Sequence, residues 1–150
     1  MKKVNPIPKG YHTVTPYLTV EGTAKLIEFL KKAFDAKEKE RMTRPDGTIG
    51  HAEVKIGDSI VMMGDAMGGH PARPTNLYLY VKNTDAFYKR ALAAGAASTM
   101  EPQDMFWGDR NAGVKDLFGN EWWIATHKEN VSPKEMKKRA EAYFKKLSQG

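Results

Sequence analysis

A repeat of about 61 residues is the feature that most constrains how this chain can fold. The stretch Tyr17–Val20 alternates like a strand and leads into an amphipathic stretch, and Tyr78–Val81 begins the same pattern again. In both copies a threonine, Thr23 or Thr84, stands where a helix should have its N-cap. Few residues are identical, but the order of elements and the positions of turns agree. The repeat predicts two modules of one plan, with two unrelated α+β halves as the alternative.

Three strand-like stretches follow each predicted helix. Gly57-Asp58 and Gly119-Asn120 provide tight turns between the last two strands of each copy. The predicted strands are Lys37–Thr43, Ile49–Ile56, Ser59–Met63, Ala97–Met100, Ala112–Leu117 and Glu121–Thr126. Each copy therefore has the order strand–helix–strand–strand–strand, and the sequence predicts an α+β fold of two βαβββ modules.

The organisation along the chain follows from these modules. The predicted parts are a basic N-terminal extension (1–11), a first module (12–66), a linker (67–75), a second module (76–127) and a C-terminal amphipathic helix (128–150). Ser132–Glu135 is a capping box, and the helix behind it has an apolar stripe and a lysine-rich back. We expect this stripe to pack on the same body or on a second subunit rather than on a membrane.

The composition excludes several classes of protein. The chain has no cysteine, which rules out disulfides, Cys-ligated zinc and iron–sulfur clusters. No apolar run is long enough for a membrane span, and no apolar segment follows the charged N-terminus, so we expect a cytoplasmic protein without a membrane partner. The net charge of +6 lies in the two ends, which leaves residues 11–127 nearly neutral. This distribution argues against nucleic acid as a partner.

One candidate for chemistry is the pair His51 and Glu53. The two residues lie two apart on a predicted strand, so their side chains share one face and could bind a metal or act as acid and base. No third ligand is evident in the sequence. A pair that is solvated or hydrogen-bonded to its neighbours is therefore the alternative.

A second candidate is the predicted loop Met105–Gly113. It brings Phe106 and Trp107 close to Asp109 and Arg110, and aromatic walls with a planar cation suit a flat or anionic small molecule. A structural role is equally open, with the aspartate accepting loop amides and the arginine paired with an acid.

Two further patterns concern faces of predicted strands. Trp122 and Trp123 are neighbours on a strand and must point to opposite faces, so one belongs to a core or interface and the other is free to line a cavity. By the same alternation, Tyr78 and Tyr80 share a face.

At the level of motifs, the chain resembles the vicinal oxygen chelate superfamily, which includes glyoxalase I, bleomycin-resistance proteins and extradiol dioxygenases, and within it the PhnB-like branch. The stretches that carry the resemblance are Thr15–Leu18, Gly50–Glu53, Ile56–Ser59, Phe106–Arg110 and Asp116–Trp122. The resemblance covers about residues 12–127. It implies a cupped mixed sheet built from the two modules, a homodimer, and a ligand in the cup.

The resemblance also bears on metal binding. The superfamily's metalloenzymes carry one ligand on the first and the last strand of each module, which corresponds here to Thr15, Val61 (or Met62 if the strand slips by one), Asn76 and Trp123. None of these is a strong ligand for a divalent metal. We therefore expect no metal at these positions and no cofactor.

Together these features favour a protein that binds a small organic molecule in a pocket without the usual metal site. The predicted pocket residues are His51, Phe106, Trp107, Arg110 and Trp123, with Arg110 holding the charge of the ligand. The alternative is an enzyme of lyase, isomerase or dioxygenase type that uses His51 and Glu53 as acid–base residues or metal ligands.

Overall fold

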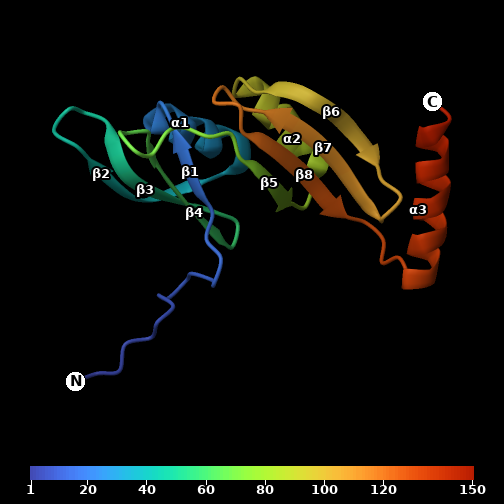
Figure 1. The fold of residues 1–150 in the computed structure, drawn as a ribbon, viewed down its shortest axis with the longest axis horizontal. Coiled ribbons are helices and arrows are strands. Elements are labelled where there is room, and N and C mark those ends of the chain that lie inside the picture. Colours follow the sequence, from blue (N-terminus) through green and yellow to red (C-terminus); the bar gives the residue numbers. More distant parts are fainter. The chain divides into compact units, whose positions relative to one another are not determined.

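The computed structural model describes residues 1–150, which form two compact units (Figure 1). The first unit comprises Met1–Thr75 with Leu117–Asn120, and the second comprises Asn76–Asp116 with Glu121–Gly150. Each contains a four-stranded mixed sheet and a helix in the order βαβββ, so the predicted α+β fold of two such modules is confirmed.

The first unit contains the sheet β1-β4-β3-β2, in which β1 and β4 are parallel and the other pairs antiparallel. Its elements are β1 (Tyr17–Val20), α1 (Thr23–Phe34), β2 (Lys37–Thr43), β3 (Ile49–Ile56) and β4 (Ser59–Asp65). Alternation sends Leu18, Val54 and Met63 into the core under α1, where each is fully buried. Their neighbours Tyr17 and Met62 therefore lie on the opposite side, the helix-free face of the first sheet.

The second unit repeats this topology with the sheet β5-β8-β7-β6. Its elements are β5 (Asn76–Tyr80), α2 (Thr84–Ala93), β6 (Ala97–Asp104), β7 (Asp109–Lys115), β8 (Glu121–His127) and α3 (Pro133–Ser148). Trp122 is fully buried in the core while Trp123 is only half-buried, which confirms that they face opposite ways. The rings of Tyr78 and Tyr80 lie 5.2 Å apart, as expected for residues on one face.

The helix caps differ from the prediction by one residue. Gly22 and Asn83, not the threonines, are the N-caps of α1 and α2. The Asn83 side chain accepts a hydrogen bond from the backbone N–H of Ala86, as an N-cap should. Gly22 has no side chain, so its helix is capped from a distance by Asp65, whose Oδ1 accepts from the N–H groups of Gly22 and Thr23 at 2.8 Å each.

The segment Met105–Gly113, predicted as a loop, is mostly strand. β7 begins at Asp109, three residues before the predicted start at Ala112. The polar residues at its beginning concealed the strand, because their partners come from other elements. Gly108 is the last residue of the true turn, and its φ of 101° favours glycine.

Helix α3 begins as the capping box predicts, with Ser132 Oγ accepting from the N–H of Glu135 at 3.2 Å. It contacts its own unit through Phe106, whose ring centroid lies 5.1 Å from that of Tyr143 and 6.3 Å from that of Phe144. Phe144 and Leu147 stay exposed. None of the helices has both the length and the apolar character that crossing a membrane requires.

Candidate functional site

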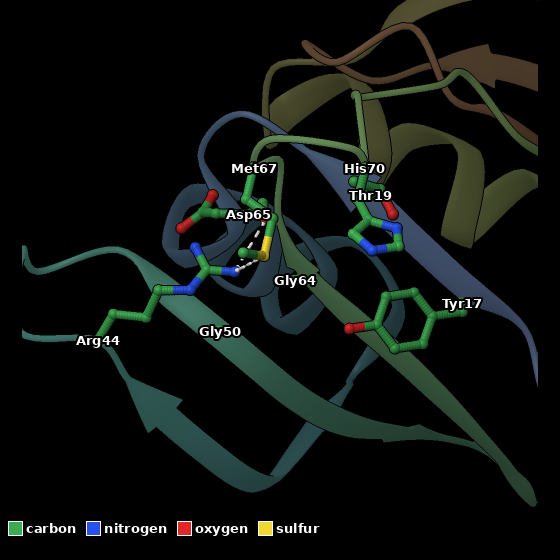
Figure 2. A pocket seen from close by; sticks show the side chains of 8 residues that line it. All are labelled: Tyr17, Thr19, Arg44, Gly50, Gly64, Asp65, Met67 and His70. Atoms are coloured by element: carbon green, nitrogen blue, oxygen red, sulfur yellow. Dashed lines mark hydrogen bonds between the residues drawn. The ribbon is translucent and has the colours of Figure 1, made fainter.

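A pocket of about 320 Å³ lies in the first unit (Figure 2). It is lined by Tyr17, Thr19, Arg44, Gly50, Gly64, Asp65, Met67 and His70. Arg44 reaches in from one side, while Tyr17 and His70 point into the same space from the other. Its residues come from β1, β3, β4 and the two loops that follow β2 and β4.

Two glycines in adjacent strands leave room for the polar side chains. A Cβ atom at Gly64 would lie 2.9 Å from the Tyr17 hydroxyl and 2.8 Å from the carbonyl oxygen of Gly50. A Cβ at Gly50 would lie 3.3 Å from Nε of Arg44. Glycine inside a strand weakens it and marks a close approach, and here the groups that approach are a hydroxyl and a guanidinium.

Arg44 carries a positive charge into this pocket. Its guanidinium donates to Thr48 Oγ1 at 3.1 Å and to the backbone carbonyl of Asp65 at 3.4 Å, and lies 3.3 Å from Sδ of Met67. These hydrogen-bond partners are all neutral, and the exposed carboxylate of Asp46 interacts with the guanidinium without a hydrogen bond to it. A guanidinium held in place by neutral acceptors keeps its charge for an anion.

The carboxylate of Asp65 is occupied elsewhere. Besides the two N–H groups at the start of α1, it accepts a hydrogen bond from the N–H of Ile49 at 2.7 Å. Burial acts to raise the pKa of Asp65, but the three backbone donors outweigh burial and lower it. Asp65 thus joins α1 and β3 to the end of β4 and shapes the pocket wall.

A chain of polar groups starts at Tyr17 and leads away from the pocket. The Tyr17 hydroxyl lies 3.4 Å from Nδ1 of His51, and Nε2 of His51 lies 3.7 Å from Oε1 of Glu53. Glu53 is only 3% exposed, and the Tyr11 hydroxyl contacts its two oxygens at 2.8 and 2.7 Å. Lys39 Nζ in turn donates to the Tyr11 hydroxyl at 2.7 Å.

The charge on Glu53 is maintained by these neighbours. Burial acts to raise its pKa, yet the Tyr11 hydroxyl and the ammonium of Lys39 bring the pKa of Glu53 below its ordinary value. His51 and Glu53 share a face, as the sequence predicts, and they lie in a cluster of polar side chains with Tyr11, Tyr17 and Lys39.

The structure also brings a second carboxylate next to this pair, which the sequence did not reveal. Glu40 is the register partner of Glu53, and one ligand atom each from Glu40, His51 and Glu53 lie within 4.8 Å of one another. A shift in the β2–β3 register between Glu38 and Glu40 sets this pairing. A bulge of this kind has no sequence signal that would identify Glu40.

In the second unit, Arg110 is bound by acids. Its Nε and Nη2 donate to the two carboxylate oxygens of Asp85 at 2.7 and 2.9 Å, and Nη1 donates to Asp104 at 3.2 Å. These bonds raise the pKa of Arg110 further above its already high value. Asp85 lies in the first turn of α2, so Arg110 lies on the side of the sheet that the helix covers.

The predicted aromatic pocket residues Phe106, Trp107 and Trp123 make contacts within the second unit. Trp107 Nε1 donates to Asp109 at 3.1 Å, and Phe106 packs edge-on against Trp107 and against Phe144 of α3. Trp123 is the register partner of Tyr78 and lies over Gly113, where a Cβ would come within 2.8 Å of its ring. It therefore lies on the helix-free face of the second sheet, opposite to Arg110.

The predicted pocket residues are thus distributed over several places. His51 belongs to the first unit and neighbours the pocket through Tyr17, whereas Phe106, Trp107, Arg110 and Trp123 belong to the second. A joint pocket of these five stays a prediction. Sequence reasoning missed Arg44 and Tyr17, although Gly50 within a predicted strand could have signalled a close approach there. Gly64 gave no such signal, because the predicted strand ended at Met63 and β4 continues to Asp65.

Comparisons with known proteins agree with this architecture. The family model of the Glyoxalase/Bleomycin resistance protein/Dioxygenase superfamily matches residues 11–124. An uncharacterized protein of Mycobacterium bovis is 39% identical over 120 residues, covering 73% of this chain and 79% of its own length. Protein YjdN of Escherichia coli is 33% identical over 103 residues, which cover 65% of this chain and 70% of that protein. The crystal structure of TioX from Micromonospora sp. ML1 superposes with a TM-score of 0.64 at 26% identity, covering 81% of this chain and all of that one.

Proposed function

This chain belongs to the glyoxalase/bleomycin resistance protein/dioxygenase superfamily, and from that premise we propose that it binds a small organic anion in the pocket of its first unit. A place in the PhnB-like branch and a homodimer as the working assembly are parts of the same proposal. The sequence motifs support the branch, and light scattering of the purified protein tests the assembly.

Arg44 is the observation that carries the proposal. Its guanidinium faces a pocket large enough for a small organic molecule, and its hydrogen-bond partners are neutral. A carboxylate or phosphonate that accepts two parallel N–H bonds from it would form the strong kind of charge-assisted pair. Tyr17 and Thr19 add hydroxyl groups to the same lining.

The metal site of the superfamily's metalloenzymes does not fit the residues of this chain. Thr15 precedes β1, Asn76 begins β5, and Trp123 carries an indole. On β4, Val61 lies in the core at 3% exposure, which leaves the thioether of Met62 on the helix-free face. Thr and Asn offer only neutral oxygens, and no imidazole or carboxylate stands among these four positions.

A matched pair of variants tests the proposal. Arg44→Ala should lower the affinity for a bound carboxylate or phosphonate by about 10-fold to 100-fold, since a charge-assisted pair contributes roughly 1.5–3 kcal/mol. Arg110→Ala removes the same group where it is already paired and should leave the affinity within about 2-fold. Binding is measured by calorimetry after a thermal-shift screen of small carboxylates, phosphates and phosphonates.

The opposite result would move the site. If Arg110→Ala abolishes binding while Arg44→Ala does not, the ligand lies against Arg110, the residue to which the sequence analysis assigned its charge. A screen in which no anion shifts the melting temperature of the native protein would contradict the proposal as a whole.

A second candidate function rests on the grouping of Glu40, His51 and Glu53. An imidazole and two carboxylates within 4.8 Å are a donor set suited to zinc, manganese or iron, and an enzyme of the superfamily could use a metal held there. Elemental analysis, with Glu40→Gln as the variant, tests it. Metal bound at about one equivalent by the native chain, and lost in Glu40→Gln, would favour this function.

A further inference from the structure

Helix α3 has an apolar stripe that the rest of the second unit covers only in part. Its members are spaced three and four residues apart, which brings them onto one side of the helix. They are Met136, Ala140, Tyr143, Phe144 and Leu147. No residue of α3 is buried, and Figure 1 shows the helix beside the second sheet rather than packed on it. Phe144 and Leu147 are 60% and 59% exposed, so the second half of the stripe is open.

The helix is nevertheless anchored to its unit. Arg139 donates to both oxygens of Glu129 at 3.0 and 2.9 Å, to Glu135 at 3.1 Å and to the backbone carbonyl of Phe106 at 3.2 Å. The ring of Phe106 also contacts that of Tyr143. These contacts fix the direction in which the stripe faces. They leave its second half in water, which is unfavourable unless another surface covers it.

The remaining charges on α3 are almost all positive. Arg139 and Glu135 pair with each other in the anchor, which leaves one acidic side chain, Glu141, against five lysines. The lysines are exposed, and they are Lys134, Lys137, Lys138, Lys145 and Lys146. With about 3.6 residues per turn, Lys137 and Lys146 lie at the two margins of the stripe and the other three lie behind it. An acceptor for this surface must therefore be apolar in the middle and negatively charged on both sides.

An anionic lipid surface has this chemistry. Aromatic and leucine side chains enter the boundary between headgroups and acyl chains, while lysine stems lie along the apolar region and bring their ammonium groups to the phosphates. A protein partner would have to desolvate the lysines at both margins, and lysine is depleted in protein interfaces. Pairing with α3 of a second copy would bring lysines of like charge together.

We propose that α3 attaches the protein to the surface of an anionic lipid bilayer. The open half of the stripe enters the headgroup boundary, the lysines contact headgroup phosphates, and the helix lies along the surface without crossing it. One short stripe gives a reversible attachment that salt weakens. The inference does not depend on the pocket of the first unit, so each proposal is tested separately.

Co-sedimentation of the full chain with vesicles tests the inference. One set of vesicles contains phosphatidylcholine alone, and in the other about one third of the lipid is phosphatidylglycerol. The native protein should bind the anionic vesicles at least about 10-fold more tightly, and salt should reduce this preference. Equal binding to both kinds of vesicle, or no binding to either, would overturn the proposal.

A first pair of variants tests the stripe. Phe144→Ser combined with Leu147→Ser removes the open apolar side chains and should lower the affinity for anionic vesicles by about 10-fold to 100-fold. Leu117→Ser is the control, because this leucine is also exposed but lies outside α3. It should bind like the native protein. Undiminished binding of the double variant would contradict insertion of the stripe.

A second pair tests the lysines at constant net charge. Lys145→Gln combined with Lys146→Gln should lower the affinity by about 25-fold, since each lysine at an anionic surface contributes about 5-fold. Lys2→Gln combined with Lys3→Gln removes the same charge from the N-terminal extension and should stay within about 2-fold of the native affinity. Equal losses in the two variants would show that overall charge, rather than α3, causes the binding.

Light scattering without lipid tests a second copy as the occupant. All the replaced side chains are exposed, so the variants should melt like the native protein. The combined Phe144→Ser and Leu147→Ser variant should keep the oligomeric state of the native chain. A native dimer that becomes a monomer in this variant would show that the partner's stripe covers this one, and would overturn the lipid proposal.

Discussion

The two units place different chemistry on the same backbone plan. In the first sheet one row across the helix-free face contains Tyr17, Met62 and Glu53, and the corresponding row of the second contains Tyr78, Trp123 and Gly113. The first unit therefore has a buried carboxylate where the second has a glycine covered by an indole ring. Repetition of a fold preserves the strand register, while each row is free to become a polar site or an aromatic surface.

The two units also differ in the hydrogen bonds that attach the start of the helix to the sheet. Asp65 at the end of β4 accepts three backbone N–H bonds, two of them from the start of α1. In the second unit Thr126 stands at the equivalent place and accepts one, from the N–H of Thr84 at 3.0 Å. A carboxylate that satisfies three donors contributes more than one hydroxyl.

The largest effect is therefore expected from Asp65→Ala. Hydrogen bonds to charged groups contribute roughly 1.5–3 kcal/mol each and are not additive, so the loss in unfolding free energy should be about 4 kcal/mol. Thr126→Val should lower the unfolding free energy by about 1 kcal/mol, which is the usual contribution of a side chain that caps a helix. Urea unfolding followed by circular dichroism measures both.

Two controls sharpen this comparison. Asp65→Asn keeps one carbonyl acceptor and should recover part of the loss. Because the pKa of Asp65 is lowered in the fold, its contribution is present above the unfolded pKa of about 3.9 and disappears as the pH falls through the folded value. Equal losses for Asp65→Ala and Thr126→Val would mean that the two caps are equivalent.

The turns between the second and third strands of each module provide the next comparison. Gly47 and Gly108 both have positive φ, 87° and 101°. A Cβ at Gly47 would meet nothing within 4 Å, whereas one at Gly108 would collide with the backbone carbonyl of Glu129. The carbonyl of Gly108 also accepts from the N–H groups of Lys128 and Glu129, so this turn holds the segment that leads to α3.

Gly47→Ala should therefore lower the unfolding free energy by about 1 kcal/mol, which is the backbone strain alone. Gly108→Ala should lower it by about 3 kcal/mol, because the segment after β8 must also move. Unfolding in urea gives the two values. Hydrogen exchange of the amides of Lys128 and Glu129 shows whether the segment is released. Protected amides in Gly108→Ala would contradict the stated reason for the larger loss.

The repeat explains why the fold could be predicted from the sequence. Both βαβββ orders follow from apolar alternation and turn glycines, and β2 and β3 have the predicted bounds. The start of β7 was missed because Asp109 and Arg110 look like loop residues until the partners that satisfy them are known. Those partners lie on α2 and β8, too far away in the sequence for a local pattern to reveal them.

The candidate site could be predicted only in part, for the same reason. Alternation along one strand is enough to pair His51 with Glu53, but Glu40 depends on a bulge in the neighbouring strand. Arg44 reaches the pocket because the turn from Arg44 to Thr48 closes through backbone bonds and returns it over Gly50. From the sequence, Arg110 is a better candidate than Arg44 for holding a ligand, because aromatic residues precede it. In the structure, however, the carboxylates of Asp85 and Asp104 already pair with it.

A third comparison concerns two of the buried carboxylates, Glu53 and Asp109, each 3% exposed. Tyr11 alone supplies a hydroxyl to Glu53, whereas Asp109 accepts from Tyr78 at 3.0 Å, from Trp107 at 3.1 Å and lies 2.8 Å from Nδ1 of His127. Tyr11→Phe should therefore lower the unfolding free energy by about 2 kcal/mol, because it leaves a buried carboxylate without its hydroxyl donor. Tyr78→Phe should lower it by about 1 kcal/mol, because Asp109 keeps its other partners. Urea unfolding compares them, and a larger loss for Tyr78→Phe would reverse the ranking.

The smallest effect is a pH dependence confined to the second unit. His127 stands between two acceptors, Asp109 Oδ1 and Asn130 Oδ1, both at 2.8 Å from its ring nitrogens. The hydrogen bonds to Asp109 and to Asn130 raise the pKa of His127. A raised pKa means that this contribution to stability is complete below the unfolded value of about 6.5 and is lost as the pH rises through the folded value.

The melting temperature of the native chain should therefore fall slightly between pH 6 and pH 9, and His127→Gln should remove that part of the slope. Asn130→Ala keeps the contact between His127 and Asp109, which is the larger cause of the raised pKa. This variant should therefore remove less of the slope than His127→Gln does. NMR titration of the His127 ring gives the folded pKa directly. A slope that is the same in His127→Gln as in the native chain would show that other groups produce it.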